Sequence, residues 1–333
     1  MKGSCFSLLR LPRSLGDLFK FFLCALCVFG GQFALVGCAS RQTQAARLPP
    51  VEVWGKEKAA TAGNFIGPRA VTVDDKNDWV YIVDSSGRIQ KFTRGGKFLK
   101  QWRTPSIEKG KPEGLALTPE GNLVVTDTHY SRVLIYSPEG KLLKKFGSYG
   151  SGPDQFVLAT GVAVDKQGNI YVADYNGAPG EGLRVRIHKF DANAKFLLEW
   201  GGYGEAPGKF RRLNGIAVDP EGNVVVADIV NHRIQIFSPQ GKLLRYFGKL
   251  GKGDGELNYP YGVAVGKDGS IYVVEWGNCR VQKFTPEGKF IAKWGGVGRA
   301  PGKLAHPWGL AVDEHGYVYV ADTENDRVQK FKL

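Results

Sequence analysis

The residues of this chain that could do metal chemistry are histidines close to a recurring acidic position. His129 and His232 follow Asp127 and Asp228 by two and four residues, and His306 lies nearer the C-terminus. Three imidazoles form a ligand set that zinc accepts in proteins. Because their offsets from the acidic position differ, we expect the three side chains not to share one centre. The chain has no GxSxG or HExxH motif and no Cys–His nucleophile pattern, so no other catalytic motif stands out.

The acidic position belongs to a phrase that occurs six times. Four copies read GVAVDKQGNIYVAD from Gly161, GIAVDPEGNVVVAD from Gly215, GVAVGKDGSIYVVE from Gly262 and GLAVDEHGYVYVAD from Gly309, and looser copies start at Ala70 and Gly114. An Arg-led run and a run ending in an aromatic residue plus glycine follow each copy. The alternation of aromatic and β-branched residues is typical of short strands. Four such strands per repeat predict a propeller.

The last copy ends after its third strand, and a matching fourth strand lies at the other end of the propeller. The segment VEVWG at 51–55 matches LLEWG at 197–201 and IAKWG at 291–295. We therefore expect this N-terminal strand to complete the sixth blade and close the ring, which removes open sheet edges. The predicted fold is all-β, one six-bladed propeller over residues 51–333.

The phrase DxxNxRIQ carries a family resemblance. It occurs with small variations in Asp228–Arg233 and Asp322–Arg327, and the repeats resemble those of the NHL-repeat family over residues 51–333. The resemblance implies a six-bladed β-propeller, a scaffold that carries many unrelated functions. We interpret the recurring Asp and Arg as a brace for the turn between the second and third strands rather than as a charged active site.

The repeat pattern is also similar to two families of six-bladed enzymes. The peptidylglycine amidating lyases imply zinc held by histidines, but the corresponding positions here hold Glu113, Tyr261 and Trp308. The lactonases imply a channel cation held by Glu, Asn and Asp. Glu113 and Asn214 occupy suitable positions for it, while the remaining ligands have no counterpart. A metal-dependent enzyme at the channel mouth is therefore the alternative function, and no cofactor is expected.

The residue just before each repeat's glycine should surround the channel mouth, on the face that carries the long inter-blade loops (the loop face). These ring positions hold Arg69, Glu113, Thr160, Asn214, Tyr261 and Trp308. Their chemistry varies from blade to blade, as in a binding site, and Trp276, Arg211 and Arg212 add aromatic and basic groups nearby. Clustered aromatic residues with arginine are typical of sites for sugars, peptides or proteins. The alternative is that Trp276 and Trp308 fill the channel.

The charge of the chain favours an anionic partner. The formal net charge is +13, and basic residues outnumber acidic ones in the inter-blade loops. Five lysines open the fourth strands on the opposite face, where they protect strand edges: Lys97, Lys141, Lys195, Lys242 and Lys289. The predicted function is a binding or scaffolding module for a protein or an anionic envelope glycan. Nucleic acid is not expected as a partner of an exported protein.

The N-terminal segment predicts export and a lipid anchor. Basic residues precede an apolar run over residues 21–37, which suits a signal peptide better than a spanning helix. The run ends in Leu35-Val36-Gly37-Cys38, which resembles the lipobox of bacterial lipoproteins. We expect a signal peptide over 1–37, lipidation of Cys38, a flexible tether over 38–50, and a location on the extracytoplasmic side of a bacterial membrane.

Overall fold

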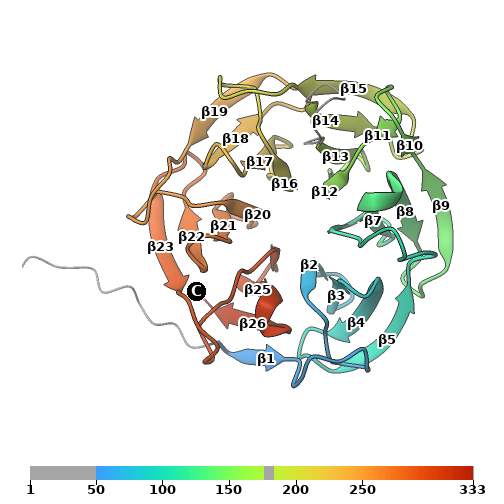
Figure 1. Ribbon diagram of the computed structural model, residues 1–333, viewed down its shortest axis with the longest axis vertical. Helices are drawn as coiled ribbons and strands as arrows, with labels where there is room; N and C mark the ends of the chain where they lie inside the picture. The colour runs from blue at the N-terminus through green and yellow to red at the C-terminus, as the bar shows by residue number, and fades with distance from the viewer. Residues whose placement is uncertain (1–49, 176–183, 333) are drawn as a thin grey trace, which may run out of the picture. The chain divides into compact units, whose positions relative to one another are not determined.

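Six four-stranded antiparallel sheets surround a central axis in this structure, a computed structural model (Figure 1). It describes residues 50–175 and 184–332, which belong to one compact unit, Gln44–Leu333. The predicted signal peptide, Cys38 and nearly all of the predicted tether lie outside the described residues. Within the described ranges, no helix is both long and apolar enough to cross a membrane.

Each blade runs outward from the axis in chain order. Blade one contains β2 (Pro68–Asp74), β3 (Trp79–Asp84), β4 (Arg88–Thr93) and β5 (Phe98–Arg103), and blade two contains β6 (Gly114–Leu117), β7 (Leu123–Asp127), β8 (Arg132–Tyr136) and β9 (Leu142–Phe146). Blade three contains β12 (Ala159–Val164), β13 (Ile170–Tyr175), β14 (Val185–Phe190) and β15 (Phe196–Gly201), and blade four contains β16 (Leu213–Val218), β17 (Val224–Asp228), β18 (Arg233–Phe237) and β19 (Leu243–Phe247). Blade five contains β20 (Pro260–Val265), β21 (Ile271–Glu275), β22 (Arg280–Phe284) and β23 (Phe290–Gly295).

Blade six is built from both ends of the described chain. Its strands are β24 (Leu310–Val312), β25 (Tyr317–Asp322), β26 (Arg327–Lys332) and, on the outside, β1 (Glu52–Trp54). β1 pairs antiparallel with β26, and Glu52 lies opposite Lys330. The expected closure of the ring by the N-terminal strand is therefore present (Figure 1).

Short elements lie in the inter-blade loops and in the turns that follow the second strands. β10 (Ser148–Tyr149) and β11 (Gln155–Phe156) form a parallel pair between blades two and three. The 3-10 turns η1 (Thr128–Tyr130) and η2 (Thr323–Asn325) follow β7 and β25.

Neighbouring blades pack face to face through apolar clusters. In one of them, Tyr171 and Ile187 of blade three lie with Ile216 and Val224 of blade four. β17 and β18 are buried along their whole length, because both faces of a blade contact its neighbours. The cores of the protein therefore lie between blades, and the ends of the strands are left to form the two functional faces.

The recurring glycine is required by close approach of the innermost strands. A Cβ added to Gly215 would lie 2.7 Å from the Tyr261 carbonyl oxygen, and one added to Gly309 would lie 2.4 Å from that of Arg69. Real Cβ atoms do not come so close to backbone. Five glycines share this arrangement and form a collar around the axis: Gly114, Gly161, Gly215, Gly262 and Gly309.

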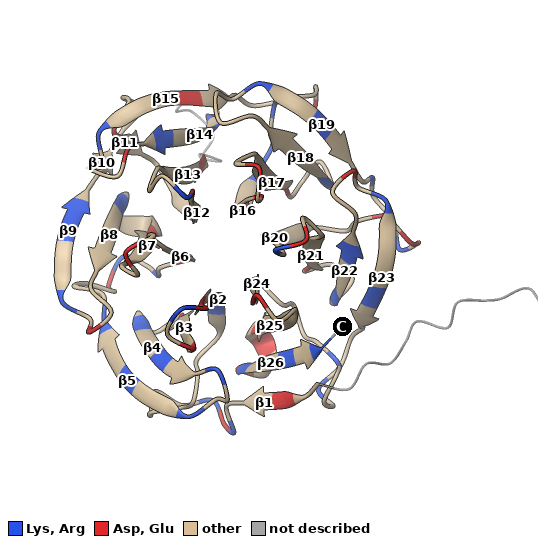
Figure 2. Cartoon of the chain, turned by 180° about the vertical axis from the view of Figure 1, so that it is seen from behind, with Lys and Arg blue, Asp and Glu red and all other residues tan. Residues whose placement is uncertain are grey.

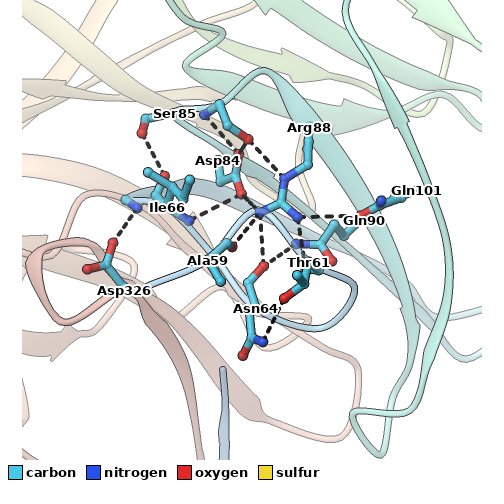
Figure 3. Close-up of polar contacts among 12 residues, drawn as sticks. Ala59, Thr61, Asn64, Ile66, Asp84, Ser85, Arg88, Gln90, Gln101 and Asp326 are labelled. Carbon is cyan, nitrogen blue, oxygen red and sulfur yellow. Dashed lines mark hydrogen bonds and ion pairs between the residues drawn. The ribbon is translucent and has the colours of Figure 1, made fainter. Parts of the chain in front are cut away.

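The recurring Asp–Arg pair braces the inter-blade loop. Arg233 Nε donates to Asp228 at 2.9 Å, and its other nitrogens donate to the carbonyl oxygens of Glu205, Ala206 and Lys209. Arg88 and Asp84 make the same kind of network in blade one, where Arg88 reaches three loop carbonyls (Figure 3). The role expected from the sequence was support of the turn between strands two and three. The structure extends that support to the loop that enters each blade.

Candidate functional site on the loop face

Four of the ring residues line a small cavity at the channel mouth. The cavity has a volume of about 60 Å³, and Arg69, Glu113, Asn214 and Trp308 line it together with the collar glycines. Arg69 forms an ion pair with Glu113 in the neighbouring blade, and its guanidinium lies 4.5 Å from the centre of the Trp308 ring. The two charges at this mouth therefore largely neutralise each other.

An aromatic ladder extends from this mouth across blades six and five. Trp308 meets Tyr261 edge to face at 4.5 Å between ring centres, and Tyr261 lies 6.2 Å from Trp276. The next rungs are Tyr259, at 6.1 Å from Trp276, and His306, at 4.2 Å from it. Trp308 lines the mouth cavity, whereas Trp276 does not. Of the two tryptophans considered as channel fillers, Trp308 alone stands at the channel.

The ladder grades from buried to exposed. Tyr261 is buried, Trp276 is half-buried and Tyr259 is 39% exposed. Burial raises the pKa of the Tyr261 phenol, and the Arg212 guanidinium opposes that rise. The phenol therefore stays protonated at neutral pH and can donate a hydrogen bond. Tyr259 is therefore the most accessible of these three rings.

Arg212 and Tyr175 join the ladder from blades four and three. The Arg212 guanidinium lies 5.5 Å from the ring centre of Tyr261 and 5.5 Å from that of Tyr175, distances that permit cation–π attraction. Sequence analysis missed Tyr175. A signal for it exists, because Tyr175 follows Asp174 in the slot that Trp276 occupies after Glu275.

Two other expected site residues have different surroundings. The Thr160 hydroxyl is buried and lies 3.2 Å from the carbonyl oxygens of both Ala173 and Leu213, which share its single proton. It therefore joins blades three and four rather than offering a group to a ligand. Arg211 pairs with Glu205 at 2.9 Å on the exposed part of its loop, and its backbone N–H donates to Asp228.

The three histidines considered for zinc each have a separate partner. Nδ1 of His129 accepts from the Lys111 N–H, and Nδ1 of His232 accepts from the Tyr259 N–H. Nδ1 of His306 lies 2.7 Å from a Glu324 carboxylate oxygen. Among the residues that the structure describes, no three His, Cys, Asp or Glu side chains form a group that could hold a metal ion.

The opposite face is predominantly acidic near the axis, although Lys166 and Lys267 also line its cavity. A cavity of about 420 Å³ opens there, and its acidic lining residues are Asp75, Asp165, Asp219, Asp313 and Glu314. Figure 2, turned by 180° from Figure 1, shows acidic segments in red on inner turns beside β3, β20 and β24. The cationic and aromatic groups of the ring thus belong to the loop face.

Fold and site together define a six-bladed β-propeller with a cluster of polar and aromatic groups at one channel mouth. The NHL repeat family model matches residues 210–237, 257–284 and 304–331. NHL repeats are thus identified in blades four, five and six of this six-bladed β-propeller.

Two named proteins are similar in sequence to part of this chain. NHL repeat-containing protein 3 of Homo sapiens is 31% identical over 180 residues, which cover 50% of this chain and 50% of that protein. Peptidyl-glycine alpha-amidating monooxygenase of Mus musculus is 35% identical over 135 residues, 37% of this chain and 13% of that protein. The chain therefore spans about half the length of the first relative and much less of the second.

Two solved structures show the same fold at low identity. A virginiamycin B lyase from Staphylococcus aureus aligns with a TM-score of 0.54 and 15% identity, covering 81% of this chain and 97% of that one. A gluconolactonase of Xanthomonas campestris aligns with a TM-score of 0.61 and 13% identity, covering 85% and 96%. At this identity the likeness concerns the fold alone.

Proposed function

We propose that this chain is a membrane-tethered, extracytoplasmic binding and scaffolding module. Its loop face would hold an anionic partner, either an acidic protein surface or a charged envelope glycan. The observation that carries this proposal is the continuous contact from Arg69 through Trp308 and Tyr261 to Trp276. Aromatic residues and arginine are enriched among the residues that dominate binding energies, especially where they are partly buried and packed.

The contrast between the two channel mouths supports an anionic partner. Arg212 lies beside the ladder without a carboxylate partner, whereas the lining of the opposite mouth holds more carboxylates than lysines. An anionic partner would be attracted to the first face and repelled from the second, so charge alone would orient its approach.

A capture experiment on membranes tests the binding function. The tethered wild-type protein, the Trp308→Ala variant and the Lys242→Ala variant would be compared as baits. We expect a partner retained by the wild type and by Lys242→Ala, whose change lies on the opposite face, but lost with Trp308→Ala. Equal retention by all three baits would contradict the proposal.

The membrane tether is tested at Cys38. The sequence Leu35-Val36-Gly37-Cys38 supports lipidation there. We expect the mature wild-type protein to partition into detergent and to carry acyl chains, and the Cys38→Ala variant to carry none. Acylation that persists in the Cys38→Ala variant would contradict lipidation at Cys38 and place the lipid on another residue.

A further inference from the structure

Arg212 is a half-buried arginine whose hydrogen-bonding capacity is unused. Within residues 50–175 and 184–332, most arginines donate to a carboxylate or a carbonyl oxygen. Arg212 and Arg299 are the two in those ranges whose guanidinium has neither a hydrogen bond nor an ion pair. Arg299 is exposed and is solvated by water, whereas Arg212 is half-buried. None of the Arg212 nitrogens is fully buried, so its N–H groups face solvent and can bind a ligand without breaking a contact within the protein.

The tyrosines on either side hold the Arg212 guanidinium in place without satisfying its N–H groups. Tyr175 ends β13 in blade three, and Tyr261 lies in β20 in blade five, so rings from two flanking blades attract the cation. Cation–π attraction acts through the ring faces and uses none of the five N–H donors. The planar fork is therefore positioned in advance and remains available to an acceptor.

Asn214 provides a second, independent sign of a ligand at this mouth. The residue is only 6% exposed, it lines the channel-mouth cavity, and its Oδ1 has no hydrogen-bond partner. Buried polar atoms are normally hydrogen-bonded, and an exception marks a place where a ligand or water completes the set. Asn214 lies two residues after Arg212, so one loop-to-strand junction supplies both unsatisfied groups.

Two nearby glutamates are paired with other arginines and do not compete for Arg212. Glu113 is engaged by Arg69 on the far side of the ring, and Glu205 is engaged by Arg211. Arg212 is thus the cation beside the ladder for which the described residues supply no carboxylate. A carboxylate or phosphate group matches its fork with two parallel hydrogen bonds.

We propose that Arg212, held between Tyr175 and Tyr261, is the receptor for an oxyanion of the ligand, a carboxylate or a phosphate group, with the Asn214 amide as a polar contact at the inner end of the same site. This inference rests on the proposed binding function and specifies the chemistry that the loop face recognises. The aromatic ladder would then accommodate the uncharged part of the same ligand.

Arginine side-chain NMR on the purified full chain tests the proposal directly. The Nε–H signals would be followed during titration with glucuronate, with inorganic phosphate and with uncharged glucose, at constant ionic strength. We expect a saturable shift of the Arg212 signal with at least one of the two anions and none with glucose. The anion that saturates it identifies the oxyanion as carboxylate or phosphate. No saturable shift with either anion, or an equal response to glucose, would overturn the proposal.

Variants separate recognition from general charge. Arg212→Gln should weaken anion binding about tenfold or more, because charge-assisted hydrogen bonds are lost. Arg212→Lys should recover only part of that loss, since it restores the charge without the fork. Asn214→Asp should weaken binding by placing a like charge beside the anion. The exposed Arg299→Gln is the matched control and should bind as the wild type does. Equal affinities for the wild type and Arg212→Gln, both with native melting temperatures, would exclude this role.

Comparing two variants distinguishes failure of the anion-receptor proposal from failure of the proposed binding function. If Arg212→Gln keeps wild-type affinity for the captured partner while Trp308→Ala loses it, the anion receptor is wrong and the binding face stands. If neither change affects the partner, both proposals fail.

Discussion

Lys330 Nζ donates a hydrogen bond of 2.8 Å to Glu52 Oε1, joining two residues that are 278 positions apart in the sequence. The same Nζ also donates to the Arg94 carbonyl oxygen at 2.9 Å, so blade one is linked to the same point. Arg94 in turn pairs with Asp313 at 3.0 Å. The seam between the first and last blades is therefore fixed by polar contacts as well as by the β1–β26 ladder.

The first prediction concerns this seam. Deleting residues 38–56 removes β1, exposes the β26 edge, and uncovers the cluster in which Trp54 packs with Phe92 and Tyr319. We expect a large drop in melting temperature or aggregation, because an unpaired strand edge templates association. The matched control is deletion of residues 38–49 alone, which leaves β1 in place. If both truncations melt and remain soluble like the parent, closure by β1 does not stabilise the ring.

The second prediction concerns the glycine collar. Gly215→Ala would force a methyl group to within 2.7 Å of backbone in blade five. Because the innermost strands must move apart to admit it, we expect a loss of about 2 kcal/mol in the free energy of unfolding, a typical cost of overpacking. Chemical denaturation measures it. Gly95→Ala is the control, since Gly95 is exposed and its nearest neighbour would lie 4.0 Å away. Equal stability of the two variants would contradict the close-approach explanation.

The collar and the closing strand show what the sequence could reveal. Six copies of one phrase and the match between VEVWG and LLEWG are local patterns, so the propeller and its closure could be predicted from them. The ring positions could be listed for the same reason. The role of each residue at or beside the ring could not be predicted, because it depends on the direction of the side chain. Thr160 points into the interface between blades three and four, whereas Arg212 points toward Tyr175 and Tyr261. Such contacts join residues of different repeats, so they produce no recurring pattern in the sequence.

The third prediction concerns the protonation of His232. Its Nδ1 accepts the Tyr259 N–H at 3.1 Å, and burial, followed by the charge of Arg211, lowers the pKa of His232. The folded state therefore favours the neutral ring. Its stabilising contribution is present above the unfolded pKa of about 6.5 and is lost as the pH falls through the folded-state pKa.

NMR titration of the ring protons measures this pKa. Arg211→Ala should raise the pKa of His232 because it removes a like charge, and Arg299→Ala should leave it unchanged. An identical His232 titration in the wild type and in Arg211→Ala would show that Arg211 has no influence on the ring.

The fourth prediction concerns zinc. The ring positions hold Arg69, Glu113, Thr160, Asn214, Tyr261 and Trp308, and none of these is a histidine. His129, His232 and His306 make three separate contacts. We expect no stoichiometric zinc after equilibration with the metal and dialysis, and no amidating-lyase activity. One tightly held zinc per chain, measured by elemental analysis and lost on replacing any of the three histidines, would instead favour the enzyme alternative.

The fifth prediction separates charge from aromatic contact in partner binding. Trp308 packs between Arg69 and Tyr261 at 4.5 Å from each, so Trp308→Ala removes an anchor from the middle of the ladder. We expect a loss of roughly 2 kcal/mol or more in binding free energy, expressed mainly as faster dissociation.

Arg211 is more exposed and pairs with the exposed Glu205. Arg211→Ala should therefore slow association at low salt and leave dissociation almost unchanged. Surface binding kinetics with the captured partner measures both rates, with Lys242→Ala as the control on the opposite face. If Lys242→Ala alters the rates as much as the two loop-face changes do, the partner does not bind at the ladder.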